Sequence, residues 1–481
     1  MGHPRDPRQT RRQFLSNTCV AAGAVAGATA LASSTAFADA PSAAKPNIVF
    51  ILVDDMGWSD LVCYGNRFHE TPNIDRLAAQ GMRFTNAYAA APVCSPTRAS
   101  IVSGQYPARV GITDFIAGHT RPYARLNMLR NRQQYMPLET ATFAESLSAA
   151  GYTCGAFGKW HLGGRKYFPD KQGFAESVVT GGWAHFGNSS IPDLGLTKDD
   201  YLAEVLTDQA EAFLETHQDR PFCLYLSHYA VHLPLEARKE LIAKYEAKAK
   251  PETGVNNPVY AAMVEHVDQS TGRVLAKLDE LGLTDNTVVV FFSDNGGLRH
   301  IYTGDGEIVT TNAPLRDEKG SLYEGGIREP LIVRWPGVVE PGATCDTPTT
   351  SVDFYPTMLE LAGARPPVGQ TLDGLSLMPV LKGKKRLKRD TLYWHYPHYH
   401  HTTPAGAIRK DDWKLIEYFE DGRLELYNLG NDIGETTNLA EKHPRRARRL
   451  QRQLAAWRAE VGAEIPTPNP DYDPARAHEW G

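Results

Sequence analysis

The chain has 481 residues, of which 42% are hydrophobic and 22% are charged, and its formal net charge is −5 at pH 7. This composition is ordinary for a globular protein and argues against long disordered stretches and a multi-span membrane protein. The acidic balance does not suggest a nucleic-acid partner. The length favours one large domain with a smaller appendage.

The amino-terminal region has the layout of an export signal, with a basic start, an Ala/Gly-rich apolar middle and a small-x-small end at residues 36–38. Arg11 and Arg12, followed by Gln-Phe-Leu, resemble the twin-arginine signal that export machinery recognises on folded proteins. The middle is too weakly apolar for a stable membrane span. We therefore predict that residues 1–38 direct export to the periplasm or outside the cell; a disordered basic tail is the alternative.

Four continuous apolar runs predict strands: residues 47–55, 152–161, 221–228 and 287–295. Uninterrupted hydrophobicity is typical of strands that are buried on both faces of a mainly parallel sheet. Helical patterns lie between these runs: residues 71–81, 138–151, 199–218 and 257–282. The alternation predicts an α/β fold in which helices sandwich a large mixed, mainly parallel sheet.

The composition changes after residue 363. A Pro/Gly-rich link and the basic run 382–389 lead to short aromatic segments and a final helix: residues 391–397, 412–419, 424–429 and 443–462. This order predicts a small antiparallel sheet with one helix, packed on the first domain. We assign residues 46–365 to the α/β domain, 366–465 to a C-terminal α+β subdomain and 466–481 to a tail. The basic run is interpreted as a solvated loop, although it could attract a sulfated polymer.

Two predicted strands end in paired oxygen donors, Asp54-Asp55 and Asp294-Asn295. Ligands of open parallel sheets lie beyond the carboxyl ends of the strands, so we expect these side chains to meet at one edge. Three carboxylates in one place repel one another unless a hard divalent cation neutralises them, and oxygen-only ligands favour Ca²⁺ or Mg²⁺ over zinc. Taken separately, each pair could instead be a helix cap or a turn.

Cys94 lies just before a predicted helix start, because Pro96 is followed by a helical pattern and proline is tolerated in the first turn. The positive end of the helix and Arg98 favour an anion, so a thiol there is expected to be acidic and nucleophilic. A cysteine phosphatase is one interpretation, but the spacing from Cys94 to Arg98 is shorter than the C-x-x-x-x-x-R of that class. The five cysteines after the export signal are scattered, which does not suggest a disulfide framework.

The spacing C-x-P-x-R from Cys94 to Arg98 resembles that of the type I, formylglycine-dependent sulfatases of the alkaline phosphatase superfamily, including bacterial arylsulfatases. Further blocks resemble this family in its order along the chain: residues 46–60, 158–163, 293–297 and 318–337. Two later segments resemble bacterial members: residues 407–416 and 425–439. The resemblance implies an alkaline phosphatase-like fold and hydrolysis of sulfate esters, with sulfated saccharides or aryl sulfates as substrates.

The resemblance also implies that a formylglycine-generating enzyme, or another sulfatase-maturating enzyme, oxidises Cys94 and that the resulting aldehyde is hydrated to a geminal diol. One hydroxyl attacks sulfur and the other expels sulfate as the carbonyl re-forms, whereas a serine would retain the sulfuryl group as a stable ester. One metal ion is implied, Ca²⁺ or alternatively Mg²⁺, held by Asp54, Asp55, Asp294, Asn295 and the residue at position 94.

Five further side chains match catalytic positions of the family. Arg98, Lys159 and Lys319 correspond to the cations that hold the diol and the sulfate oxygens. His161 corresponds to the histidine that helps to remove the diol proton, and His232 to the one that protonates the leaving alcohol. Lys159, His232 and Lys319 are also expected to bind the substrate.

Two assignments stay open on the residues alone. His228 lies in the same segment as His232 and could reach the site in its place. A histidine-rich run could line a saccharide pocket or bind a transition metal, with a solvated aromatic strand edge as the alternative: His395, Tyr396, His398, Tyr399, His400 and His401.

Two other functions are compatible with this scaffold. A phosphoric or phosphonic ester hydrolase could use the same nucleophile and cation, although two-zinc phosphatases need more histidines at strand ends. A non-catalytic protein that binds sulfated glycans would be expected to carry a broken motif set, and every catalytic position here holds a competent residue.

Overall fold

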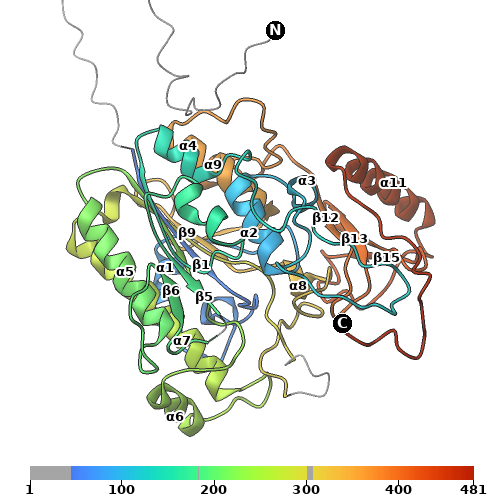
Figure 1. Ribbon diagram of the computed structural model, residues 1–481, viewed down its shortest axis with the longest axis horizontal. Helices are drawn as coiled ribbons and strands as arrows, with labels where there is room; N and C mark the ends of the chain where they lie inside the picture. The colour runs from blue at the N-terminus through green and yellow to red at the C-terminus, as the bar shows by residue number, and fades with distance from the viewer. Residues whose placement is uncertain (1–44, 183, 301–306) are drawn as a thin grey trace, which may run out of the picture. The chain divides into compact units, whose positions relative to one another are not determined.

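The computed structural model describes residues 45–182, 184–300 and 307–481. Over these residues the chain forms a large layered α/β part and a smaller sheet with a long helix beside it (Figure 1). The predicted export signal, residues 1–38, lies outside the described residues. Within the described ranges, no helix has the length and apolar character needed to cross a membrane.

The large sheet is built around the four predicted strands, which run parallel in its centre: β1 (Asn47–Val53), β4 (Thr153–Gly158), β7 (Phe222–Ser227) and β8 (Thr287–Ser293). Five further strands extend it: β2 (Met82–Phe84), β5 (Glu176–Gly181), β6 (Ser189–Ile191), β9 (Leu331–Arg334) and β10 (Ala343–Cys345). The order of these described strands is β10-β2-β9-β8-β1-β7-β4-β5-β6, and antiparallel pairs occur towards both edges. The predicted mixed, mainly parallel α/β fold is confirmed.

The five outer strands are not among the elements that the sequence predicts. β2, β6 and β10 have three residues each, which is too short for a periodic hydrophobic signal. They become strands because a neighbouring strand offers hydrogen-bonding partners, which is a property of the fold.

Two hydrophobic cores lie on opposite faces of the large sheet. Residues of β1 alternate between them: Ile48, Phe50 and Leu52 on one face, and Val49, Ile51 and Val53 on the other. The first core includes helices α2 (Cys94–Ser103), α4 (Phe143–Ala149) and α9 (Phe354–Ala362), and the second includes α1 (Pro72–Ala79), α5 (Leu202–His217) and α7 (Pro258–Glu280). Figure 1 shows the two groups of helices on either side of the sheet. Burial on both faces explains the uninterrupted apolar run of β1.

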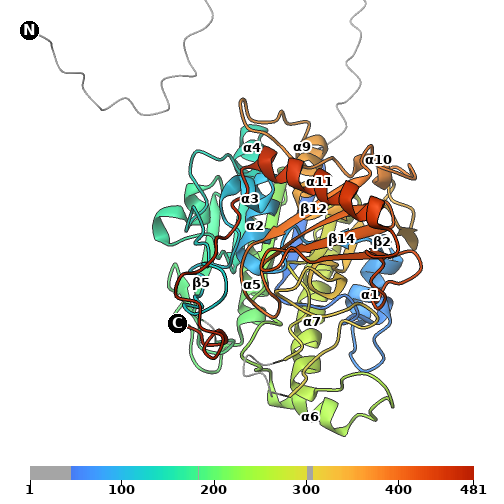
Figure 2. The same cartoon turned by 90° about the vertical axis from the view of Figure 1, so that its right-hand side faces the viewer.

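The C-terminal part contains the predicted small antiparallel sheet, with strands paired in chain order: β12 (Thr391–Tyr396), β13 (Ala405–Lys410), β14 (Trp413–Tyr418) and β15 (Leu424–Asn428). Helix α11 (Pro444–Val461) packs on this sheet through Leu450, Leu454 and Trp457 (Figure 2). Strand β13 is not predicted, because its Ala-Gly-Ala start lacks strand-forming side chains. The boundary near residue 365 stays a prediction; residues 45–481 form one compact unit.

The remaining described elements are short. They are β3 (Ala87–Tyr88), β11 (Thr349–Thr350), α3 (Pro107–Val110), α6 (Lys239–Ala247), α8 (Glu324–Ile327), α10 (Met378–Leu381) and 3₁₀ turns at Val62–Tyr64, Arg165–Tyr167, Pro169–Lys171, Thr284–Asn286 and Ser351–Asp353. The basic run 382–389 lies at the surface apart from the buried Leu387 and the half-buried Arg389, as expected of a solvated loop.

Candidate active site

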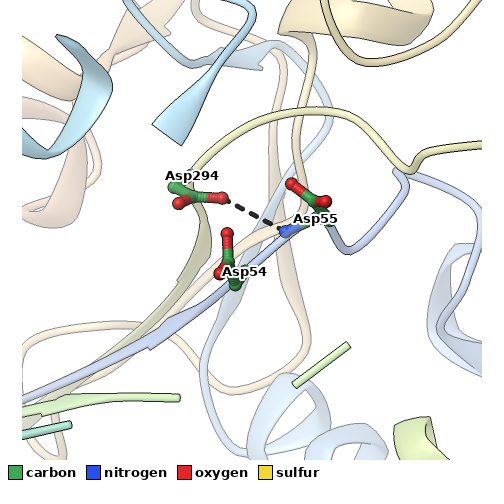
Figure 3. Close-up of side chains that lie close together, drawn as sticks. All are labelled: Asp54, Asp55 and Asp294. Atoms are coloured by element: carbon green, nitrogen blue, oxygen red, sulfur yellow. Dashed lines mark hydrogen bonds between the residues drawn. The ribbon is translucent and has the colours of Figure 1, made fainter. Parts of the chain in front are cut away.

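The carboxylates of two neighbouring strands meet at the carboxyl edge of the large sheet. Val53 of β1 lies opposite Ser293 of β8, so the residues that follow the two strands are neighbours. Asp54, Asp55 and Asp294 lie together in Figure 3, where the backbone N–H of Asp55 donates to Asp294 Oδ1 at 3.2 Å. All three are buried, with one oxygen of each within 4.8 Å of the others. No second group of this kind occurs among the described residues.

The donor atoms of this cluster suit a hard divalent cation. Oδ1 of Asp54 and Oδ1 of Asn295 are buried and accept no hydrogen bond from the described part of the chain. Buried oxygens without a partner are costly, and a bound cation would relieve that cost. The Asn295 amide donates to Asp55 Oδ1 at 2.7 Å, which ties it to the cluster. Since every donor is an oxygen, the group is able to bind Ca²⁺ or Mg²⁺.

Burial and charge act in opposite directions on these carboxyl groups. Burial raises the pKa of Asp294 to about 7, and the neighbouring charge of Asp54 adds to this effect. Burial also opposes ionisation of Asp54, but the positive charges around it, led by Lys159, hold its pKa below the usual value. The cluster therefore depends on nearby cations to keep its negative charge.

Arg98 is the most firmly held of these cations. Its Nε donates to Asp294 Oδ2 at 2.8 Å, and its Nη1 donates to the Ser227 hydroxyl at 2.6 Å and to the Lys159 carbonyl at 2.9 Å. Ser227 belongs to no motif in the sequence, although it ends β7, the strand beside β1. Arg98 thus links α2 to the ends of β4, β7 and β8.

Two lysines complete the set of cations. Lys159 follows β4 and donates to Asp54, while its ammonium nitrogen lies 4.9 Å from the centroid of the Tyr229 ring. Lys319 donates to Asp55 Oδ2 at 2.7 Å. Both lysines are buried, so the predicted cations and the predicted metal ligands lie in one cluster.

Cys94 begins α2 and its side chain is buried beside His161. Sγ of Cys94 lies 3.2 Å from Nδ1 of His161, and Nε2 of the same ring lies 2.5 Å from the carbonyl oxygen of Ile116. A carbonyl only accepts, so Nε2 carries the proton and the lone pair of Nδ1 faces position 94. Burial and the charge of Lys159 hold the pKa of His161 well below its ordinary value, which keeps the ring neutral.

The acidic thiol expected from the helix start is not found. Burial raises the pKa of Cys94, and this effect outweighs the charges of Lys159 and Lys319. A thiolate nucleophile needs a lowered pKa, so this environment does not favour the cysteine phosphatase interpretation.

The two candidate histidines after β7 have different surroundings. Nε2 of His228 lies 3.0 Å from the Ser270 hydroxyl of α7. Nε2 of His232 lies 3.7 Å from Asp55 Oδ2, so His232 is the one beside the carboxylates. Its Nδ1 lies 2.7 Å from the Leu233 carbonyl and carries a proton, which leaves Nε2 to gain or lose one. Burial lowers the pKa of His232 to about 4.

The first half of the histidine-rich run is structural. His395 and His398 are buried, with Nε2 atoms 2.9 Å from the Glu464 carbonyl and 2.9 Å from the Thr113 hydroxyl, respectively. Neither belongs to a group with metal-binding spacing among the described residues. Their burial also makes the alternative of a solvated strand edge wrong for these two residues.

The second half of the run borders the candidate site. Nδ1 of His401 lies 2.7 Å from the Lys319 carbonyl oxygen. The His400 ring packs on Gly320, where an added Cβ would come within 2.0 Å of its Nδ1, so only glycine fits at this position. The end of the run therefore contacts the loop that carries Lys319.

Comparison with known proteins gives the family. A family model described as Sulfatase matches residues 46–364, and one described as N-sulphoglucosamine sulphohydrolase, C-terminal, matches residues 317–460. A sulfatase of Formosa agariphila is 34% identical across 89% of this chain and 91% of its own length. The N-acetylgalactosamine-6-sulfatase of Mus musculus is 34% identical across 83% of this chain and 78% of its own length.

The fold agrees with these matches. The crystal structure of Ps i-CgsB in complex with k-i-k-neocarrahexaose has a TM-score of 0.75 and 28% identity, covering 89% of this chain and 94% of that one. The fold and the cluster of buried carboxylates at the carboxyl edge of the large sheet together define a hydrolase of the alkaline phosphatase superfamily. The chain belongs to the sulfatase family, whose members hydrolyse sulfate esters, and the resemblance noted in the sequence is confirmed.

Proposed function

We propose that the chain hydrolyses sulfate monoesters by means of a formylglycine made from Cys94. The observation that carries this proposal is the position of Cys94, which begins α2 with the lone pair of His161 Nδ1 3.2 Å from its Sγ. A hydrated aldehyde supplies one hydroxyl that captures the sulfuryl group and a second that expels sulfate.

In this proposal two histidines move the protons. Nδ1 of His161 accepts a proton from the residue at position 94, because Nε2–H is already donated to the Ile116 carbonyl. Nε2 of His232 is the nitrogen assigned to the leaving alcohol, because its Nδ1–H is held by the Leu233 carbonyl. Since burial lowers the pKa of His232 to about 4, Nε2 must first take up a proton before it can give one to the alcohol. Each ring thus presents one defined nitrogen to the reaction.

The three cations have different tasks. Arg98 is fixed by Asp294 and Ser227, so it orients the carboxylate cluster and the start of α2. Lys159 and Lys319 carry compact ammonium groups on flexible stems, and we assign them to the sulfate oxygens and to substrate binding. The buried surroundings strengthen both interactions.

We assign one metal ion, Ca²⁺ or alternatively Mg²⁺, to Asp54, Asp55, Asp294, Asn295 and the residue at position 94. The buried oxygens of Asp54 and Asn295 that accept no hydrogen bond from the described residues support this assignment. When bound, such a cation acidifies an attacking hydroxyl and polarises a sulfate oxygen.

Sulfated saccharides are the proposed substrate class, with aryl sulfates as small alternatives. A relative is named for N-acetylgalactosamine 6-sulfate, and a structural neighbour was crystallised with a neocarrahexaose. Turnover of an aryl phosphate faster than the matching aryl sulfate would instead favour a phosphoric ester hydrolase.

We also propose that residues 1–38 direct export through the twin-arginine machinery and that a formylglycine-generating enzyme acts on Cys94. The support for both is the sequence: the paired arginines and the C-x-P-x-R spacing. Export of folded chains allows this oxidation to precede export.

Mass spectrometry of the tryptic peptide that spans residues 84–98 tests the central step. The expected result is the mass of an aldehyde in place of the Cys94 thiol in protein that hydrolyses p-nitrophenyl sulfate. Full activity in a preparation whose peptide carries only the thiol would contradict the proposal.

A further inference from the structure

A cationic pocket lies near the candidate active site. Its volume is about 510 Å³, within the range of small-ligand sites. Its lining includes three arginines, two tyrosines and one acidic residue: Arg299, Arg316, Arg423, Tyr323, Tyr418 and Asp317. Nothing in the proposed sulfate chemistry uses these side chains.

The pocket shares two chain segments with the site. Arg299 lies shortly after Asn295, and Asp317 lies shortly before Lys319. Glu318 ties the two segments together, because its Oε2 accepts the backbone N–H of Arg299 at 2.6 Å. The segments that carry Asn295 and Lys319 therefore both continue into the lining of the pocket.

The lining favours anions over bare sugar rings. The guanidinium carbons of Arg316 and Arg423 lie 3.8 Å and 4.0 Å from the ring centroids of Tyr323 and Tyr418. Stacked guanidinium groups occupy the ring faces that would otherwise stack on a sugar. A stacked guanidinium keeps its in-plane N–H groups available to carboxylate or sulfate oxygens.

Positive charge exceeds negative charge in this lining. Nε of Arg299 is buried and donates to no acceptor in the described ranges. Arg316 donates to neutral acceptors, the Tyr427 hydroxyl at 3.1 Å and the Glu435 carbonyl at 2.7 Å. Arg423 is the exception, because it pairs with Glu425 at 2.6 Å. Among the described residues, Arg299 and Arg316 thus form no ion pair with a carboxylate, although Asp317 and Glu425 are near enough to act on their charges.

We propose that this pocket binds a second anionic group, a sulfate or a carboxylate, of a saccharide whose sulfate ester lies at Lys319. The inference rests on the proposed function and narrows its substrate class to oligosaccharides with at least two anionic groups. Arg299 and Arg316 are then specificity determinants.

The test measures KM and kcat for p-nitrophenyl sulfate and for three disaccharides with one scissile sulfate. The first disaccharide has no other charge, the second has a second sulfate and the third has a uronate carboxylate. Arg299→Gln and Arg316→Gln should each raise KM for a doubly anionic probe about tenfold relative to p-nitrophenyl sulfate, without lowering kcat. The control Arg452→Gln removes an exposed arginine of α11 and should match the wild type.

The disaccharide probes distinguish a bound sulfate from a bound carboxylate, and the comparison with p-nitrophenyl sulfate distinguishes the pocket proposal from the sulfatase proposal. Whichever doubly anionic disaccharide shows the KM effect identifies the bound group as sulfate or carboxylate. Unchanged KM ratios, or equal losses on p-nitrophenyl sulfate, would overturn the inference and leave the sulfatase proposal standing. If the wild type turns over no sulfate at all, calorimetry of the same disaccharides decides. Tighter binding of a doubly anionic probe that Arg316→Gln weakens supports the pocket, and equal binding overturns it.

Discussion

Two clusters of opposite charges buried in the described part of the chain can be compared, one at the carboxyl edge of the large sheet and one between that part and the small sheet. In the second cluster, Lys414 of β14 lies 2.8 Å from Glu324 and 2.9 Å from Glu435, with all three side chains fully buried. Glu324 also accepts the Tyr88 hydroxyl at 2.6 Å, and Glu435 accepts the Glu324 backbone N–H at 2.6 Å. In the edge cluster, Asp54 Oδ1 is also buried, and the ion pair that it forms with Arg98 Nη2 at 3.7 Å is longer than a hydrogen bond.

The comparison teaches that buried charge does not by itself mark a functional site. Lys414 first, and then Arg328, hold the pKa of Glu324 at about 2 against the opposing effect of burial, whereas burial raises the pKa of Glu435 to about 7 although Lys414 lies 2.9 Å from it. What distinguishes the edge cluster is that three carboxylate oxygens lie within metal-binding distance of one another and that its cation Arg98 belongs to the helix that begins at Cys94, which is why it points to chemistry.

Lys414→Met should have the largest effect on stability. It leaves Glu324 and Glu435 buried without their shared cation, so the free energy of unfolding should fall by about 3–5 kcal/mol. Urea denaturation monitored by fluorescence measures the loss. The matched control is Lys410→Met, because its partner Asp390 is exposed and the expected loss is below about 1 kcal/mol. A loss no larger than in the control would mean that the buried network is energetically neutral.

Lys319→Met should act on catalysis more than on stability. Removing this cation from the edge cluster should lower kcat/KM for p-nitrophenyl sulfate by about 10²- to 10³-fold, as does the loss of one donor to developing negative charge elsewhere. Asp55 keeps the Asn295 amide as a partner, so the stability loss should be smaller than for Lys414→Met. Lys385→Met, in the exposed basic run, is the control. Wild-type turnover in Lys319→Met would show that Lys319 serves only to neutralise Asp55.

The central strands and the edge cluster could be predicted because their signals are local. Each strand buried on both faces carries an apolar run, and the polar pairs that end β1 and β8 must converge once those strands are adjacent. The edge strands β2, β6 and β10 could not be predicted, because only their neighbours make them strands.

Parts of the site depend on tertiary contacts that no motif encodes. Every residue has a carbonyl, so nothing in the sequence indicates that Ile116 orients His161. The expected acidity of Cys94 was wrong because a helix start is a local feature, whereas burial is a property of the whole fold. The choice between His228 and His232 likewise needed the position of α7.

Asp268 extends the comparison to a buried carboxylate that depends on neutral donors. It lies on α7 and accepts the backbone N–H groups of Asn73 at 2.9 Å and Ile74 at 2.8 Å, at the start of α1. Among the described residues it has no ion-pair partner, and burial raises its pKa to about 6. Its carboxyl group therefore resists ionisation, unlike Glu324.

The pH dependence of stability tests this difference. The folded-state pKa of Asp268 lies above the value of about 3.9 for an exposed aspartate, so its contribution is fully present below about pH 4 and is lost as the pH rises through about 6. Between about pH 4 and about pH 7.5, the wild type should lose about 2–3 kcal/mol of unfolding free energy relative to Asp268→Asn. Urea denaturation at both pH values measures the unfolding free energies. The control Asp471→Asn changes an exposed residue, so its unfolding free energy should differ from that of the wild type by the same amount at both pH values. Parallel curves for the wild type and Asp268→Asn would mean that three neutral donors, two backbone N–H groups and the Asn73 amide, stabilise a buried carboxylate as well as a lysine does.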